Sequence, residues 1–370
     1  MRILEICLFS AGIDGVFARV KEESLRLARK NEVMIISSNL TKGNKDIANS
    51  EEILGKVKIM RFPAKIIGGE SYMKFSNEGE IIEKGKEFNA DVIIAHCYRH
   101  KSMDLALKIS KITGKRCFLV THAPFATDEN RSLMAKLYVR FYDRFVGPKK
   151  LKQFDKIIAI TRWEMPFLKK LGIDETKIEY IPNGIPQEFF DVKKINSREE
   201  NKILFLGRIS PIKDLEVLIR TLNLTEDIKL EIVGPAEKEY LDKLKKLIEE
   251  FGLVKRVTFT PAIFDLSEKI RKIDSAKIFI LPSRREAMPQ SLIEAMARGK
   301  MVIASDNLGT RDLIVDGENG YLFGVGNEGE LANKINLALI PDDKIGKNAK
   351  KSVEQFSWNR VIGKIEELIQ

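Results

Sequence analysis

Short apolar runs alternate with amphipathic stretches along the first half of the chain. The runs with the length and composition of buried strands are residues 3–9, 33–37, 57–62, 92–96, 117–121, 157–160 and 178–181. The stretches between them repeat apolar side chains at helical spacing, as in residues 17–29, 102–113 and 131–146. Strand and helix in alternation predict parallel β–α–β units.

The same alternation starts again after a charged, poorly patterned stretch at residues 191–201, which we interpret as a linker. Further strands are expected at residues 202–206, 229–233, 256–259, 278–281 and 301–304, with helices at residues 214–222, 237–251 and 289–298. We therefore predict an α/β protein with two Rossmann-like, doubly wound parallel-sheet domains that face each other across a cleft. Such sheets bind ligands beyond the carboxyl ends of their strands.

Composition narrows the classes of partner. The chain has 370 residues, 44% of them hydrophobic, which suffices for two buried cores. The net charge of +10 favours anionic partners such as nucleotides or phospholipid surfaces. Nucleic acid is not expected as a partner, because no nucleic-acid-binding module is recognised. Cys7, Cys97 and Cys117 lie in or beside apolar runs, which predicts buried, reduced thiols of a cytoplasmic protein. No run has the length of a membrane span or the form of a signal peptide.

The segment IFILPSRREAMPQSLIEAMARG, residues 278–299, holds two acids in different settings. Glu286 follows a buried strand in a loop, and Glu294 lies inside a helix predicted to begin at Pro289. Their backbones are then on the order of 12 Å or more apart. A glycosidase is disfavoured, because its two carboxyl groups must lie roughly 5 to 9.5 Å apart. Two acids with a helix N-terminus between them suit a nucleotide-sugar, which has hydroxyls at both ends and an anion in the middle. The alternative is a surface Glu294 paired with Arg298.

The segment LGRISPIK, residues 206–213, places two cations at the end of another buried strand. Gly207 lets the chain turn, and Arg208 and Lys213 bracket a loop that leads to a helix capped near Asp214. Two cations beside a helix N-terminus predict a diphosphate site. The alternative is a surface pair of Arg208 with Asp214.

Three glycine-containing segments are weaker signals. Gly12 and Gly15 follow the first strand, where the backbone can approach a phosphate or sugar; a tight turn without a ligand is an equal alternative. IPNGI, residues 181–185, is by itself a turn. GVGNEG, residues 324–329, matches G-x-G-x-x-G, but it lacks the later acid and strand of a dinucleotide-binding unit, so we reject it.

Histidine gives a further candidate at a strand end. His122 follows the predicted strand that ends in LVT and is expected at the mouth of the first sheet, where a purely structural role is the alternative. A zinc site is disfavoured, because the candidate ligands match no recognised spacing. These ligands would be His96, Cys97, His100 and His122.

Together, LGRISPIK, IPNGI and LPSRREAMPQSLIEAMARGKMVIASDNLGTRDLIVDGENGYLF resemble the retaining, nucleotide-sugar-dependent glycosyltransferases of the group 1 (glycogen-synthase-like, GT-B fold) family. The similarity spans nearly the whole chain and is strongest over residues 202–323. It implies an acceptor-side domain at residues 1–190 and a donor domain at residues 191–355. It also implies that a C-terminal helix near residues 356–370 packs back on the first domain. The family often has paired glycines where Leu308 and Gly309 stand, a departure that bears on donor identity.

The resemblance also implies roles for individual residues. Arg208 and Lys213 would bind the pyrophosphate and neutralise the leaving nucleoside diphosphate. Glu294 would hold the ribose hydroxyls, and Glu286 would contact hydroxyls of the donor sugar. His122 matches the histidine that faces the reacting sugar. The remaining donor-binding positions are Gly15 in the glycine loop and the helix start at Met288, Pro289 and Gln290, of which Pro289 has no amide hydrogen.

The implied activity is retaining transfer of a hexose from a UDP-, GDP- or ADP-sugar to a hydroxyl acceptor, either a glycan or a lipid-linked saccharide. We expect no metal and no other cofactor, because Arg208 and Lys213 supply the charge and the sequence has no Asp-x-Asp. Two alternatives stay open. One is a nucleotide-sugar-binding regulatory protein with reduced turnover, and the other is a sugar-nucleotide 2-epimerase.

Residues 131–152, RSLMAKLYVRFYDRFVGPKKLK, combine seven cations and one acid with apolar residues at helical spacing. Two interpretations fit this stretch. It lies on an anionic membrane surface, which would place the protein peripherally at the inner face of the cell membrane. Otherwise it is a solvated helix that packs its apolar stripe on the sheet.

Overall fold

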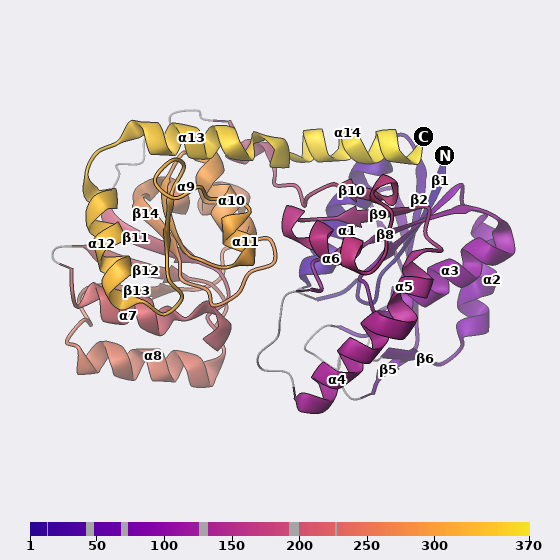
Figure 1. The fold of residues 1–370 in the computed structure, drawn as a ribbon, viewed down its shortest axis with the longest axis horizontal. Coiled ribbons are helices and arrows are strands. Elements are labelled where there is room, and N and C mark those ends of the chain that lie inside the picture. Colours follow the sequence, from indigo (N-terminus) through magenta and orange to yellow (C-terminus); the bar gives the residue numbers. More distant parts are fainter. Residues whose placement is uncertain (13, 42–47, 68–72, 126–131, 192–199, 226–227) are drawn as a thin grey trace. The chain divides into compact units, whose positions relative to one another are not determined.

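We describe the protein from a computed structural model that covers residues 1–12, 14–41, 48–67, 73–125, 132–191, 200–225 and 228–370 (Figure 1). The chain divides into two compact units, Met1–Asn183 with Val361–Gln370, and Gly184–Arg360. Each unit contains a large, mainly parallel sheet, so the predicted α/β class with two Rossmann-like domains is confirmed. Most of the predicted linker, residues 191–201, lies outside the described residues.

The sheet of the first unit has the strand order β10-β9-β8-β7-β1-β2-β4-β3, and only β3 and β4 pair antiparallel. Its strands are β1 (Arg2–Ile6), β2 (Glu32–Ser38), β3 (Glu51–Leu54), β4 (Val57–Phe62), β7 (Val92–His96), β8 (Arg116–Val120), β9 (Lys156–Ala159) and β10 (Ile178–Tyr180). A separate antiparallel pair is formed by β5 (Ala64–Ile66) and β6 (Met73–Phe75). The pattern did not predict β3, because its EEIL sequence is largely exposed.

Neighbouring strands β1 and β7 mark the point where the order of the first sheet reverses. From β1 the chain proceeds to β2 on one side, and from β7 it proceeds to β8, β9 and β10 on the other. Open α/β sheets bind ligands beyond the carboxyl ends of the strands at such a switch point. The helices of this unit are α1 (Gly15–Leu27), α2 (Glu78–Phe88), α3 (Lys101–Thr113), α4 (Leu133–Phe141), α5 (Gly147–Leu151) and α6 (Met165–Lys170). A π-helical turn, Tyr142–Val146, joins α4 to α5 and interrupts the continuous helix expected there.

The sheet of the second unit is entirely parallel, in the order β13-β12-β11-β14-β15-β16. Its strands are β11 (Glu200–Leu206), β12 (Lys229–Val233), β13 (Val257–Thr260), β14 (Ala276–Leu281), β15 (Met301–Ser305) and β16 (Tyr321–Phe323). The switch point lies between β11 and β14. The fully buried runs of β11 and β14 explain why the sequence pattern predicted these central strands.

Helices cover both faces of the second sheet (Figure 1). One face carries α9 (Leu266–Ser275), α10 (Gln290–Ala297) and α13 (Asp343–Val353), and the other carries α7 (Leu215–Leu222) and α12 (Glu328–Leu339), with α8 (Lys238–Glu250) beside α7. The short α11 (Leu308–Arg311) follows β15, and α14 (Trp358–Ile369) ends the chain. The prediction that α10 begins at Pro289 is wrong by one residue: Pro289 is the N-cap, with extended backbone, and Gln290 is the first helical residue. Gly299 ends the helix with a positive φ of 69°.

Candidate active site

The loops that follow β11 and β14 meet at the switch point of the second sheet. The amide of Arg284 donates a hydrogen bond to the carbonyl of Ile212 (2.9 Å), which ties the two loops together. Across them, Lys213 Nζ lies 2.5 Å from Glu286 Oε1, and the two side chains are only 20% and 11% exposed. Two residues predicted separately as donor-binding groups therefore form one ion pair.

Arg208 has a different environment from Lys213. Its side chain is exposed, and the part of the chain that the structure describes provides it with no hydrogen bond or ion pair. The alternative pairing of Arg208 with Asp214 does not occur, because Asp214 Oδ1 accepts from Arg284 at 3.1 Å. The turn at Gly207 depends on a neighbour that the sequence pattern did not indicate. A Cβ at Gly234 would lie 1.9 Å from the Gly207 carbonyl oxygen, so the end of β12 packs directly on this turn.

Glu294 is buried in α10 and is compensated by a lysine from α9. Glu294 is 5% exposed, and Lys269 Nζ lies 2.6 Å from each of its two carboxylate oxygens. Burial raises the pKa of the Glu294 carboxyl, and the Lys269 charge opposes that rise. The alternative pairing of Glu294 with Arg298 does not occur, because Arg298 binds Asp274 at 2.7 Å and 2.8 Å.

Polar atoms that lack hydrogen bonds gather at this end of the second sheet. Among the described residues, the buried atoms without a hydrogen-bond partner include Ser210 Oγ, Ser283 Oγ and Gln290 Nε2. Ser210 follows β11, Ser283 follows β14, and Gln290 begins α10. Such atoms are costly to bury, so their concentration is typical of a surface that a polar ligand completes. Met288 and Pro289 lead into the first turn of α10, where Gln290 begins the helix.

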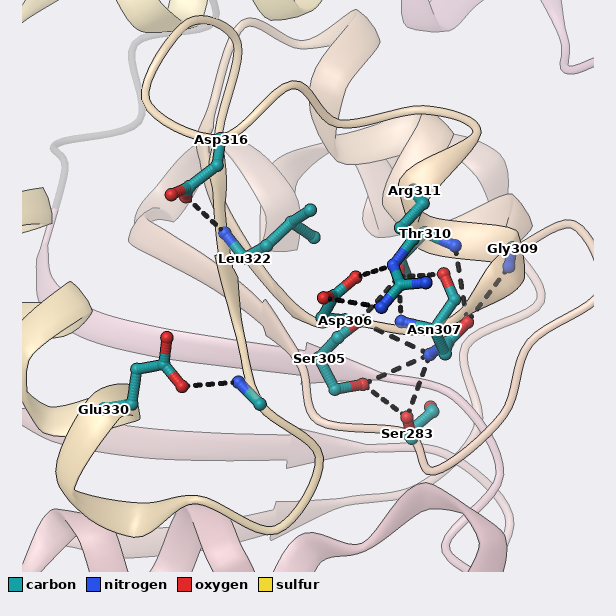
Figure 2. Close-up of polar contacts among 11 residues, drawn as sticks. Ser283, Ser305, Asp306, Asn307, Gly309, Thr310, Arg311, Asp316, Leu322 and Glu330 are labelled. Carbon is teal, nitrogen blue, oxygen red and sulfur yellow. Dashed lines mark hydrogen bonds and ion pairs between the residues drawn. The ribbon is translucent and has the colours of Figure 1, made fainter.

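The loop after β15 holds the Glu286 loop in position (Figure 2). The Asn307 side chain accepts from the amide of Gly309 (3.1 Å) and donates to the carbonyl of Ser283 (3.1 Å). A Cβ at Gly309 would lie 2.6 Å from the Glu286 carbonyl oxygen and 2.7 Å from that of Ala287. Position 309 therefore requires a glycine, and α11 acts as a backbone support for Glu286. The family resemblance flagged this position, but the contact itself appears only in the structure.

The rejected glycine motif at residues 324–329 forms the start of α12. Glu330, labelled in Figure 2, accepts through Oε2 from the amide of Gly324 at 2.7 Å. Asn327 caps α12 by accepting from the amide of Glu330 at 3.0 Å. The loop thus satisfies its polar groups internally, as an ordinary helix start does.

His122 lies just beyond β8, at the carboxyl edge of the first sheet. It and Ala123 both have left-handed backbone, with φ of 59° and 53°, which is rare for residues other than glycine. The His122 Nε2 atom lies 3.0 Å from His96 Nδ1, and His96 Nε2 lies 2.9 Å from Glu5 Oε2. Glu5 and His96 are completely buried. The sequence pattern gave no sign of Glu5, which stands in an otherwise apolar strand.

A second buried acid holds the backbone next to His122. One oxygen of Glu164 accepts from the amide of Ala123 (2.8 Å) and from Thr121 Oγ1 (2.5 Å). Its other oxygen accepts from the amides of Ile160 (2.9 Å) and Thr161 (3.0 Å). Because Glu164 is fully buried, desolvation raises the pKa of its carboxyl, against the effect of these hydrogen bonds. Glu164 thereby fixes the strained turn at residues 122–123.

Gly15 is the first residue of α1, after the N-cap Asp14, whose side chain accepts from the amide of Phe17 at 2.8 Å. Nothing in the described part of the chain lies within 4 Å of a Cβ built at Gly15, so packing against those residues does not require glycine there. Gly12 has a φ of 79° and needs glycine for the turn itself. Residue 13 of this loop lies outside the described residues.

Two further expectations concern thiols and metals. Cys7, Cys97 and Cys117 are buried free thiols, as predicted. In the described ranges, no group of three or more His, Cys, Asp and Glu side chains is arranged to hold a metal ion.

In the basic stretch, α4 and Phe145 of the π-helical turn expose their apolar side chains, whereas Tyr142 and Leu151 are buried. No residue of α4 is buried, so a helix that packs an apolar stripe on the sheet is not what the structure shows there. The large apolar side chains of α4 and the π-helical turn that are 44–75% exposed are Leu133, Met134, Leu137, Tyr138, Phe141 and Phe145. None of the described helices is both long enough and apolar enough to traverse a bilayer.

Comparison with known proteins gives consistent matches along the chain. Residues 187–352 match the family described as "Glycosyl transferases group 1", and residues 13–189 match "Glycosyltransferase Family 4". An uncharacterised glycosyltransferase of Methanocaldococcus jannaschii is 28% identical, over 62% of this chain and 62% of that protein. A phosphatidyl-myo-inositol mannosyltransferase of Mycobacterium leprae is 24% identical, over 99% of this chain and 95% of its own length. The crystal structure of HepE from Anabaena, in complex with UDP and glucose, shares the fold with a TM-score of 0.77. That structure is 19% identical and covers 100% of this chain and 99% of its own.

Proposed function

The chain belongs to the group 1 glycosyltransferases, which have the GT-B fold, and we propose that it transfers a hexose from a nucleoside-diphosphate sugar to a hydroxyl acceptor with retention of anomeric configuration. The observation that carries this proposal is the set of unsatisfied buried polar atoms around the start of α10. They lie together with the Lys213–Glu286 and Lys269–Glu294 pairs at the switch point of the second sheet.

In this proposal the diphosphate binds at the start of α10, beside Arg208 and Lys213. Backbone amides at a helix N-terminus favour an anion. Among the described residues Arg208 forms no ion pair that the diphosphate would have to break. Lys213 would exchange its ion pair with Glu286 for phosphate oxygens. Both cations then stabilise the charge that develops on the departing nucleoside diphosphate. Glu286, released from Lys213, accepts hydrogen bonds from the hydroxyls of the donor sugar.

Glu294 binds the ribose in the same scheme. Lys269 Nζ donates to Oε1 and also lies 2.6 Å from Oε2, so the lysine compensates the buried charge. Ribose hydroxyls would donate to carboxylate lone pairs that do not face the lysine. The complex of HepE with UDP and glucose makes UDP-sugars the first donors to test, followed by GDP- and ADP-sugars. His122 is assigned to the transferred sugar, and Gly15 to the approach of donor or acceptor to the backbone.

The test is a screen of UDP-, GDP- and ADP-sugars by thermal shift and by release of nucleoside diphosphate, with a chelator present. Stabilisation by one donor and acceptor-dependent release support the proposed transferase without a metal. Binding without turnover identifies the regulatory alternative, and a new sugar-nucleotide formed without acceptor identifies a 2-epimerase. A requirement for added divalent cation contradicts the metal-independent scheme.

A variant pair tests the site itself. Lys213→Ala is expected to lower kcat/KM by about 10²- to 10³-fold, because it removes a charge that acts on the leaving group. Lys243→Ala removes a comparable lysine–glutamate pair, with Glu216 at 2.8 Å, elsewhere in the same unit. The control should retain activity within about twofold, as expected for an exposed surface pair. Equal rates in the two variants contradict the assignment.

We also propose that α4 and the π-helical turn rest on an anionic membrane that carries a lipid-linked acceptor. The support is the exposure of their apolar side chains next to several cations. A pocket of about 620 Å³ opens beside them and is lined in part by Phe125, Arg140, Arg144, Phe167 and Lys170, which suits an anionic head group.

Sedimentation with vesicles tests this surface. Binding to vesicles of phosphatidylglycerol is expected, with little binding to phosphatidylcholine and a decrease as salt rises. Phe141→Ser should weaken binding, whereas Phe264→Ser, at a phenylalanine that is 83% exposed in the second unit, should not. Absence of binding at low salt contradicts membrane association.

A further inference from the structure

We propose that Glu5 and His96 are positioning residues for His122, and that together they decide which ring nitrogen of His122 carries its proton. This inference rests on the proposed function only in giving His122 a role beside the transferred sugar. The arrangement of the three residues is a feature of the first unit alone.

A continuous line of buried polar groups connects α1 with the carboxyl edge of the sheet. Ser24 Oγ donates to Glu5 Oε1 (2.7 Å), Glu5 Oε2 contacts His96 Nε2 (2.9 Å), and His96 Nδ1 contacts His122 Nε2 (3.0 Å). Glu5 lies in β1 and His96 ends β7, so the line runs through the switch point of this sheet. Burial of an acid and an imidazole among apolar strands is costly. Because this burial is costly, we infer that these groups have a role beyond packing in the core.

The hydrogen-bond inventory of these groups restricts where the protons are. An ionised Glu5 only accepts, so His96 donates from Nε2. Burial lowers the pKa of His96 to about 4, so the ring is neutral near pH 7 and its Nδ1 must accept. His122 then donates from Nε2 and, as a neutral ring, leaves its Nδ1 as a proton acceptor.

A protonated Glu5 reverses the hydrogen bonds from Glu5 to His96 and from His96 to His122. Glu5 then donates to His96 Nε2, His96 donates from Nδ1 to His122 Nε2, and His122 carries its proton on Nδ1. Burial raises the pKa of Glu5 to about 7, which places the exchange of the two arrangements near neutral pH. One buried carboxyl thus decides whether Nδ1 of His122 gives or takes a proton.

The charged groups around Glu5 come from several elements. From α1, Arg19 lowers the pKa of Glu5 and pairs with the buried Glu23 at 3.0 Å. The Arg19 guanidinium also donates to the carbonyl of Pro182 (2.9 Å) and to Asn183 Oδ1 (2.9 Å), which ties the IPNGI turn to α1. Among the described residues, the other titratable or charged groups around this cluster are Cys7, Asp14, Arg61, His96 and Cys97.

The backbone of His122 is held separately from its ring. Glu164 accepts from the amide of Ala123, so the left-handed turn does not depend on Glu5. A change at Glu5 is therefore expected to alter the proton position on the His122 ring and to leave the turn in place. This separation distinguishes a positioning role from a merely structural one.

Nitrogen NMR of the histidine rings tests the inference directly, because the chain has only three histidines. The full-length protein is labelled with 15N-histidine, and His100→Gln and His122→Gln assign the three rings. At pH 8.5 the wild-type His122 ring should carry its proton on Nε2, and at pH 6 on Nδ1. Glu5→Gln keeps the size of the side chain but does not titrate, so the exchange between the two forms should disappear.

The control is Glu22→Gln, which removes a half-buried acid of α1 that pairs with Arg26. This variant should keep the wild-type pH response. The inference is overturned if His122 holds the same tautomer at both pH values. It is also overturned if the ring takes up a second proton at pH 6 while it retains the proton on Nε2. The wild-type titration decides the matter even if Glu5→Gln fails to fold.

Kinetics provide the second readout. The pH dependence of kcat should show an ionisation near pH 7 in the wild type and lack it in Glu5→Gln, with KM for the donor changed less than about twofold. If no nucleotide-sugar is turned over, the proposed function fails, whereas the NMR titration still reports on the line from Glu5 to His122. An unchanged pH profile in Glu5→Gln contradicts the positioning role.

Discussion

Replacement of Gly309 by alanine tests whether α11 sets the position of Glu286. The added Cβ would lie 2.6 Å from the Glu286 carbonyl oxygen and 2.7 Å from that of Ala287. Both contacts are with backbone, so no side chain can rotate away. The Cβ–oxygen distance has to grow to at least 3.4 Å, where ordinary contact begins, so either α11 or the Glu286 loop must move. Overpacking of this kind costs about 1–3 kcal/mol of unfolding free energy.

The displacement also affects the site. A shift of nearly 1 Å in a positioning element can cost on the order of 10²-fold in rate. We therefore expect Gly309→Ala to lower kcat/KM by about 10- to 100-fold, and to lower Tm by roughly 2–10 °C. The assays are nucleoside-diphosphate release with the donor found in the screen, and thermal unfolding monitored by circular dichroism.

Gly329→Ala is the matched control for Gly309→Ala. Gly329 is the second residue of α12, as Gly309 is of α11, but a Cβ there meets only Asn327 Oδ1, at an ordinary 3.9 Å. The control should keep the wild-type rate and gain up to about 1 kcal/mol of stability, because alanine is the better helix former. Wild-type Tm and rate in Gly309→Ala would refute the view that α11 supports Glu286.

Three other outcomes are expected. Gly15→Ala should keep the wild-type Tm and lower the transfer rate at least about tenfold, because the added methyl group would contact the ligand and no described residue. A lowered Tm together with the lowered rate contradicts this. Gly184→Ala should lower Tm by several degrees in thermal unfolding, because its Cβ would lie 2.4 Å from the Trp358 ring, whereas Gly363→Ala, with nothing within 4 Å among the described residues, should not. The raised pKa of Glu5, about 7 instead of 4.5, means that its contribution to unfolding free energy is complete below pH 4.5 and is lost as pH rises through 7. Between pH 5 and pH 8 the unfolding free energy of Glu5→Gln should therefore rise relative to that of the wild type, by at most about 3 kcal/mol. Denaturant unfolding at the two pH values measures this difference, and an equal pH dependence in both proteins excludes the linkage.

The sequence pattern located the candidate donor-site residues because of a property of parallel sheets. Adjacent parallel strands end at the same edge, so polar residues after separate apolar runs come together even when they are far apart in the chain. Lys213 and Glu286, which pair at 2.5 Å, follow this rule. Their joint position could therefore be inferred without knowledge of a single side-chain contact.

The partners of buried acids could not be predicted in this way. Glu294 binds Lys269 of another helix, and Glu5 binds His96, which is 91 positions away in the chain. Arg298 and Asp214, the partners suggested by local spacing, bind Asp274 and Arg284 instead. Helical spacing gives several candidates for each charge, and only packing selects one of them.

The sequence by itself determined the α/β class, the two parallel-sheet units and the positions of most strands, since apolar periodicity is a local property of the chain. Only the tertiary structure decided that Gly309 supports the Glu286 backbone, that α4 leaves its apolar side chains exposed, and that Glu5 reaches His122 through His96. These features depend on close contacts between distant segments. Such contacts are set by how helices and strands pack, so they cannot be inferred from the order of residues along the chain.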